Sequence, residues 1–178
     1  MGRSFSLRGT ITIADNAVTD PPQLIFSYEA PDRKKAWKIT GAYTWCQSTD
    51  AEIGTSDLQG VATATLLTDT TNYTGGINDL SNVSDNRQCA WHQSHYMLRA
   101  GGTDFIVKNA QSPSSSAFII DEDTIVVNQL HIAFGFRTES ATSPSRDWNY
   151  LVTLEEVKLT AWESIFQQIK GMGQDVSN

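Results

Sequence analysis

Residues 130–136 read Leu-His-Ile-Ala-Phe-Gly-Phe, with a large apolar side chain at every second position. A period of two is typical of a β-strand that buries one face, because successive side chains of a strand point to opposite sides of the sheet. The same alternation recurs at both ends of the chain. Its apolar or small positions there are Phe5, Leu7, Gly9, Ile11 and Ile13, and later Trp148, Tyr150, Val152 and Leu154.

Working outward from these stretches, eight or nine strand segments follow one another with turn residues between them and no helix intervening. Such a series is typical of a sandwich, a jelly roll or a barrel, whereas a parallel sheet needs helical crossovers. No internal repeat of about 20–50 residues is present, which argues against a propeller or a solenoid. We therefore predict an all-β fold, a single jelly-roll or β-sandwich domain of about eight strands, over residues 1–159.

Residues 160–173 carry a different pattern. Thr160 and Glu163 have the spacing of a capping box, and Gly171 and Gly173 provide a stop, so we predict one C-terminal amphipathic α-helix here. Its apolar face would bury itself on the edge of the sheet or on a neighbouring subunit. In the second case it is an oligomer interface, made of Trp162, Ile165, Phe166, Ile169 and Met172.

Two finer predictions concern strand register. The first is that one face of the strand before Cys46 points into the core, which argues against a solvent-facing aromatic platform for sugars; this face comprises Trp37, Ile39, Gly41, Tyr43 and Trp45. The second is a β-bulge near Asn128-Gln129, because Ile125 and Val127 have the opposite parity to residues 130–136.

The polar segment from Thr68 to Arg87 has no periodicity. At about 20 residues it is longer than most connections between strands, so we predict a functional or interface loop.

Charge and cysteine content restrict the partners and the compartment. The net charge is −7, which argues against direct nucleic-acid binding, since phosphate contacts need clustered basic residues. Cys46 and Cys89 are the only cysteines, so a reduced compartment is the simpler interpretation. The first residues lack the apolar region of a signal peptide, and no run is long enough for a transmembrane segment.

A metal site is suggested only by Cys89, His92 and His95. Residues three apart on a strand point to opposite faces, so these side chains cannot share one site. The chain also lacks the His-x-His pair of cupin metal sites, and Asp121–Asp123 lacks the spacing of an EF-hand. We predict no metal, no cofactor and no catalytic residues.

Two segments, Asp123–Ile132 and Asp147–Glu156, resemble the closing strands of viral jelly-roll structural proteins, and the helix predicted from Thr160 to Met172 adds to this resemblance. The resemblance covers about the last third of the chain. It implies a coat or capsid-associated protein, made in the host cytoplasm and located in the virion, that forms homo-oligomers and contacts other virion proteins. Many genome-binding coat proteins have a basic N-terminal arm; this acidic chain begins a strand at once, so we expect shell or surface contacts instead.

Two other functions stay open at this level. A carbohydrate- or ligand-binding β-sandwich module would need a solvent-facing row of aromatic side chains. A glycan-active enzyme would need a cleft with two facing carboxylates, which only their separation in space can reveal.

Overall fold

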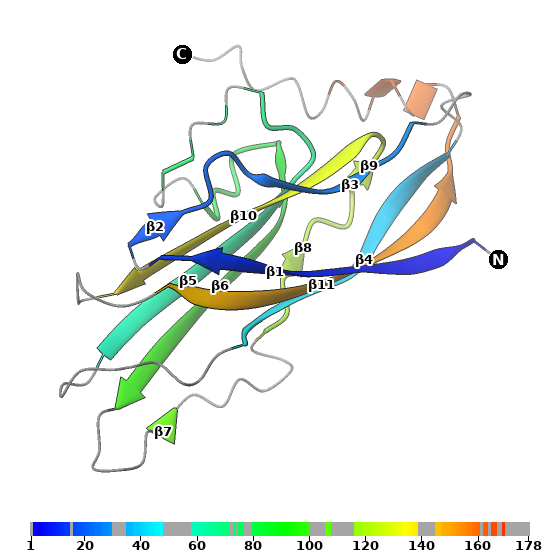
Figure 1. Cartoon of the computed structure of the whole chain (residues 1–178). Coiled ribbons are helices and arrows are strands. Elements are labelled where there is room, and N and C mark those ends of the chain that lie inside the picture. The colour runs from blue at the N-terminus through cyan, green and yellow to red at the C-terminus, as the bar shows by residue number, and fades with distance from the viewer. Residues whose placement is uncertain are drawn as a thin grey trace.

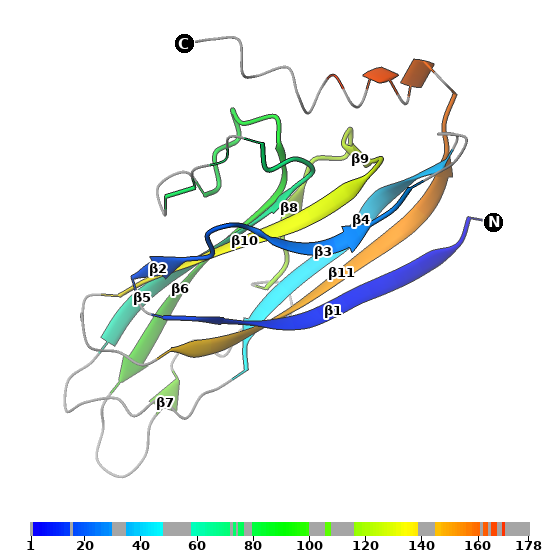
Figure 2. The same cartoon turned by 45° about the horizontal axis from the view of Figure 1, so that its top comes forward.

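The computed structural model describes residues 2–14, 16–29, 35–47, 58–71, 73, 75–76, 80–99, 106–107, 116–138, 145–160, 162–163, 165–166 and 169. Within these residues the chain forms eleven β-strands in two sheets, which confirms the predicted all-β class (Figure 1). Figures 1 and 2 show the two sheets as facing layers of a sandwich.

Sheet A has four strands. In spatial order they are β1 (Ser4–Ile13), β11 (Arg146–Lys158), β4 (Lys35–Cys46) and β9 (Ile125–Val126). In sheet B, β10 (Gln129–Thr138) pairs with β5 (Leu58–Leu67), which pairs with β6 (Gln88–Arg99). Short strands complete its edges: β2 (Ala17–Val18) and β3 (Gln23–Ser27) pair with β10, and β7 (Ile106–Val107) and β8 (Ile119–Ile120) pair with β6.

The pairing follows one rule along the chain. β1 pairs with β11, β3 with β10, β4 with β9 and β5 with β6, and all four pairs are antiparallel. If β2 and β3 are counted as one strand and the short edge strands β7 and β8 are left out, each strand of the first half pairs with its counterpart counted back from the end.

The core lies between the two sheets. Phe134 of β10 and Trp148 of β11 meet there, with ring centroids 4.8 Å apart. The predicted inward positions of residues 130–136 and of residues 148–154 are all buried, as are Ile11 and Ile13 of β1. The predicted inward positions are thus confirmed on these three strands, although β10 is buried on its other face as well, at His131 and Ala133.

Strand β4 departs from its predicted register. Trp37 and Ile39 point into the core, but Tyr43 and Trp45 are 36% and 37% exposed. Ile39 pairs with Leu154 and Gly41 with Thr153, so Thr40 is an extra residue that has no partner on β11. A bulge of one residue shifts the alternation, so the side chains that follow it point to the opposite face of the sheet from the one predicted. The prediction that Tyr43 and Trp45 belong to the core is wrong.

An irregularity does lie close to the bulge predicted near Asn128-Gln129, but its extra residue is on the partner strand: Leu130 pairs with Phe26 and His131 with Leu24, so Ile25 of β3 has no partner on β10. Val126 pairs with Trp37 in sheet A, whereas Gln129 pairs with Ser27 in sheet B. The chain crosses between the sheets without changing its inward parity: Val126 of β9 is buried, as are Leu130 and Ile132 of β10.

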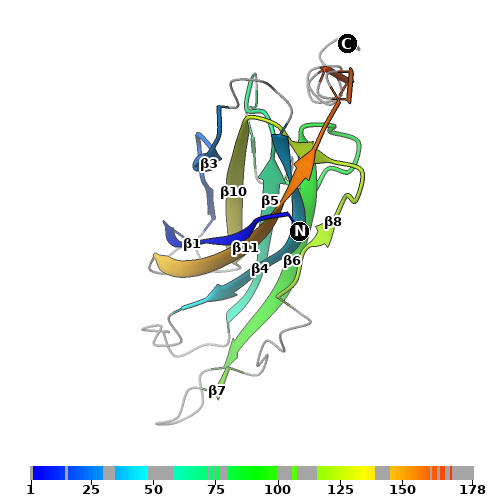
Figure 3. The ribbon, with the colours of Figure 1, turned by 90° about the vertical axis from the view of Figure 1, so that its right-hand side faces the viewer.

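At the C-terminus the capping box is confirmed. The Thr160 amide donates to Glu163 Oε2 at 2.7 Å, and the Glu163 amide donates to Thr160 Oγ1 at 3.3 Å. Figure 3 shows β11 running out beyond the sheets toward this segment. The continuous helix over 160–173 and the division at residue 159 stay predictions, since many of these residues lie outside the described part. No helix in the described part is long and apolar enough to cross a membrane.

Candidate functional site

Four apolar side chains of the C-terminal segment lie on the surface. Trp162 is 82% exposed and Phe166 is 68% exposed, and Ile165 and Ile169 are exposed with them. We call these four residues the C-terminal apolar surface. Single exposed apolar side chains are common on protein surfaces, but a patch of them is not. The cluster therefore indicates a contact site. Met172, the fifth residue predicted for an oligomer interface, lies outside the described residues.

The C-terminal apolar surface forms one wall of an open groove of about 540 Å³. The groove is completed by Leu159, where β11 has just ended, by Ile125 of β9 and by Glu163. Hydrogen bonds from the amide and hydroxyl of Thr160 hold the pKa of the Glu163 carboxyl below its usual value. The groove therefore has apolar walls and a single carboxylate that stays charged at neutral pH.

A second group of surface side chains lies on the outer face of sheet A. Tyr43 and Trp45 of β4 face solvent, and they stand opposite Leu151 and Asn149 of β11. On β1, Thr10 donates to Asn149 Oδ1 at 2.9 Å. The sequence did contain a signal for this face, because a glycine inside a strand, here Gly41, often marks a bulge.

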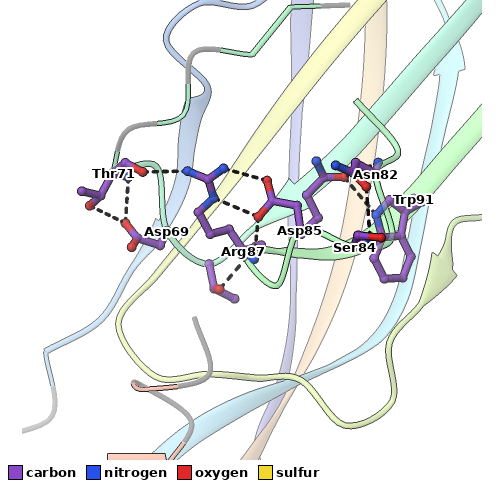
Figure 4. Close-up of polar contacts among 9 residues, drawn as sticks. Asp69, Thr71, Asn82, Ser84, Asp85, Arg87 and Trp91 are labelled. Carbon is purple, nitrogen blue, oxygen red and sulfur yellow. Dashed lines mark hydrogen bonds and ion pairs between the residues drawn. The ribbon is translucent and has the colours of Figure 1, made fainter. Parts of the chain in front are cut away.

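The described residues of the segment from Thr68 to Arg87 include one ion pair, between Arg87 and Asp85 (Figure 4). Arg87 donates from Nε and Nη2 to the two carboxylate oxygens of Asp85, each at 2.9 Å, and from Nη1 to the Thr71 carbonyl at 2.8 Å. The hydrogen bond to Asp85 raises the pKa of the Arg87 guanidinium. The same guanidinium lies over the ring of Tyr73, 5.4 Å from its centroid.

This segment covers the outer face of sheet B. Tyr73 and Leu80 are buried against Leu67 of β5 and Ala133 of β10, which makes a second, smaller apolar cluster. The Ser81 amide donates to Thr65 Oγ1 at 3.0 Å. The described part of the loop thus packs on its own sheet, and its predicted role as an interface stays a prediction.

The chain matches no protein-family model and no curated protein sequence. Among solved structures it is similar to a chain of Desmodium yellow mottle tymovirus, at 13% identity over 90% of this chain and 84% of that one, with a TM-score of 0.35. It is also similar to VP1 of Merkel cell polyomavirus in complex with disialyllactose, at 8% identity over 86% and 78%, with a TM-score of 0.32. Both are viral proteins, but similarity this weak establishes no family.

The Cys89–His95 cluster is spread over the sheet. His92 is buried and lies inside the sandwich, with Nδ1 3.2 Å from the Ala117 carbonyl, whereas His95 is exposed. The predicted opposite facing of the two histidines is confirmed. The Cys89 thiol donates to the Leu66 carbonyl. In the described part of the chain, no three His, Cys, Asp or Glu side chains are grouped as metal ligands.

Asp121 closes its own turn. Its carboxylate accepts from the Asp123 amide at 3.1 Å and from Thr124 Oγ1 at 2.5 Å. The Asp121 carboxylate thus makes hydrogen bonds within its own turn.

Buried histidines predict a pH dependence of stability. Burial lowers the pKa of His92 and of His131, so the folded state takes up protons less readily than the unfolded state. The free energy of unfolding should therefore fall as the pH drops below the ordinary histidine pKa, by at most about 1.4 kcal/mol per pH unit for each histidine.

Urea unfolding between pH 7.5 and pH 5 measures this slope. We expect His92→Gln to reduce this slope. An equal slope in the wild type and in a variant lacking both His92 and His131 would contradict the assignment.

Proposed function

We propose that this protein is a self-assembling structural subunit, a coat or capsid-associated protein of a virion, with its C-terminal apolar surface as an interface between copies. The observation that carries the proposal is the exposure of Trp162, Ile165, Phe166 and Ile169 side by side on one groove. Burying apolar area contributes roughly 25 cal/mol per Å², so covering these side chains with another copy would contribute to association.

The strand pairing supports a jelly roll. Pairing the first strand with the last, the second with the one before it, and so on inward is the arrangement of two Greek keys in a double sheet. Here β2 and β3 act as one interrupted strand, because Thr19 between them bonds Phe134 through its amide and its hydroxyl, each at 2.8 Å. Jelly rolls serve in viral capsids, lectins and cupins. The fold alone therefore does not identify the function, so the proposal depends on the interface.

The virion setting rests on the resemblance of residues 123–132 and 147–156 to viral structural proteins. In this setting the partners are further copies of the chain and other virion proteins, and the location is the virion. The net charge of −7 favours shell or surface contacts without direct binding of the genome. The proposed role includes no catalysis and no cofactor.

The test is the mass of the protein in solution, by light scattering coupled to size exclusion. We expect the wild type to form multimers, and the double variant Trp162→Ser/Phe166→Ser to fall to a monomer with its thermal midpoint nearly unchanged. Truncation after Leu159 should do the same.

Val83→Ser is the matched control, since Val83 is an apolar side chain 73% exposed at a different place; it should leave the mass unchanged. A wild type that stays monomeric at high concentration would overturn the proposal. Equal loss of assembly and of folded structure on truncation would show that the segment is part of the core.

A further inference from the structure

We propose that the outer face of sheet A binds an oligosaccharide that carries a carboxylate, with sugar rings on Tyr43 and Trp45 and the carboxylate on Arg8. This site lies on the sheet and is separate from the C-terminal apolar surface. It does not depend on the proposed assembly.

The first argument is the aromatic pair. Tyr43 and Trp45 are two residues apart on one strand, so their side chains leave the same face about 7 Å from each other. The Tyr43 ring lies along the sheet over Gly41, where a Cβ atom would come within 3.3 Å of ring atom Cε2. The face of an aromatic ring is electron-rich, and the C–H bonds on one side of a pyranose carry a partial positive charge, so the two surfaces attract.

The second argument is the polar border of the pair. Asn149 stands opposite Trp45, and its Oδ1 is occupied by the Thr10 hydroxyl. Its amide nitrogen makes no hydrogen bond with any described residue. One row further along the sheet, Thr12 donates to Asp147 at 2.6 Å. Fixed amide and hydroxyl groups beside an apolar ring are the groups that bind sugar hydroxyls.

The third argument is charge. Arg8 of β1 stands opposite Leu151, which stands opposite Tyr43, so Arg8 is two strand spacings, about 10 Å, from the aromatic pair. Arg8 is exposed and forms no ion pair with any described residue. The guanidinium therefore offers a bidentate site for a carboxylate.

Among the described residues, no acid on this face forms an ion pair with Arg8. The two acids of β11 that share the face are Asp147, opposite Thr12, and Glu155, opposite Ser4. Each of these partners is four residues from Arg8 along β1, about 13 Å away. In a chain of net charge −7, a cation on the same face as the aromatic pair, with no ion-pair partner among the described residues, favours an anionic ligand over a neutral one.

Isothermal titration with three defined oligosaccharides tests the site: a tetrasaccharide of galacturonic acid, 3′-sialyllactose, and neutral cellotetraose. We expect binding to at least one acidic sugar, and which one binds distinguishes a uronic from a sialic acid source. Trp45→Ala should weaken that binding about tenfold or more, as for other aromatic hot spots. Arg8→Gln should reduce the preference for the acidic sugar over cellotetraose.

Trp162→Ser is the control, because it removes an exposed tryptophan elsewhere and should leave the sugar affinity unchanged. No binding of any of the three sugars at about 10 mM, a demanding limit for a weak site, would overturn the proposal. An unchanged affinity in Trp45→Ala would do so as well. A lower multimer mass in Tyr43→Ala/Trp45→Ala, without an effect on sugar, would show that the face is a contact between copies instead.

Discussion

Phe134→Ala should lower the free energy of unfolding by about 3–5 kcal/mol, the usual cost of removing a buried phenylalanine. The Phe134 side chain is fully buried, and its ring lies 4.8 Å from the ring of Trp148. Phe136 also packs on Trp148, at 5.5 Å. Because Phe134 belongs to sheet B and Trp148 to sheet A, the cavity left by the substitution would lie between the two layers and could close only by moving a whole sheet.

Equilibrium urea unfolding at a concentration that keeps the protein monomeric measures the effect. Phe166→Ala is the matched control, because it deletes the same atoms from a side chain 68% exposed. We expect it to change stability by no more than about 0.5 kcal/mol. A loss below about 1 kcal/mol for Phe134→Ala would mean that this ring does not hold the sheets together.

The sequence predicted the fold best where large apolar side chains alternate along a strand. Alternation in residues 130–136 and 148–154 placed every inward side chain correctly, because a period of two fixes the facing once the register is known. The same logic failed for Tyr43 and Trp45, since the extra residue at Thr40 shifts the register within the strand. The alternation of side chains cannot by itself locate a bulge, although the glycine inside this strand, Gly41, is a residue that often marks one.

The sequence patterns did not predict that a segment outside the sandwich buries the outer face of a strand. On β5 both faces are buried: Ala64 points into the main core, while Thr65 and Leu67 are fully buried on the other side. That second burial comes from Tyr73 and Leu80, which lie in a polar segment without periodicity. Contacts between segments distant in sequence decide such burial. For the same reason, the outer face of sheet A as a candidate site could be found only in the structure.

Asp85→Ala should release the segment that covers sheet B and lower the free energy of unfolding by about 2–3 kcal/mol. Removing one partner of a fully buried ion pair costs about 3–5 kcal/mol. The cost here is smaller because the Arg87 side chain keeps 25% of its surface exposed, against 10% for Asp85. Asp85 Oδ1 also accepts the Arg87 amide at 3.0 Å, so the variant loses a backbone hydrogen bond along with the ion pair.

The double variant Asp85→Ala/Arg87→Met separates the charge from the packing. It removes the guanidinium that Asp85→Ala leaves without its carboxylate partner, and it keeps an extended apolar side chain near the Tyr73 ring. The double variant should therefore be more stable than Asp85→Ala alone. Hydrogen exchange adds a local measurement: the amides of Ser81 and Asn82, bonded to Thr65 Oγ1 and Gln88 Oε1, should exchange faster in Asp85→Ala. Unchanged exchange together with unchanged stability would show that the segment is held by the Tyr73 and Leu80 contacts alone. Faster exchange at these amides with little change at β10 would instead mean that the segment opens as a unit while the sandwich stays folded.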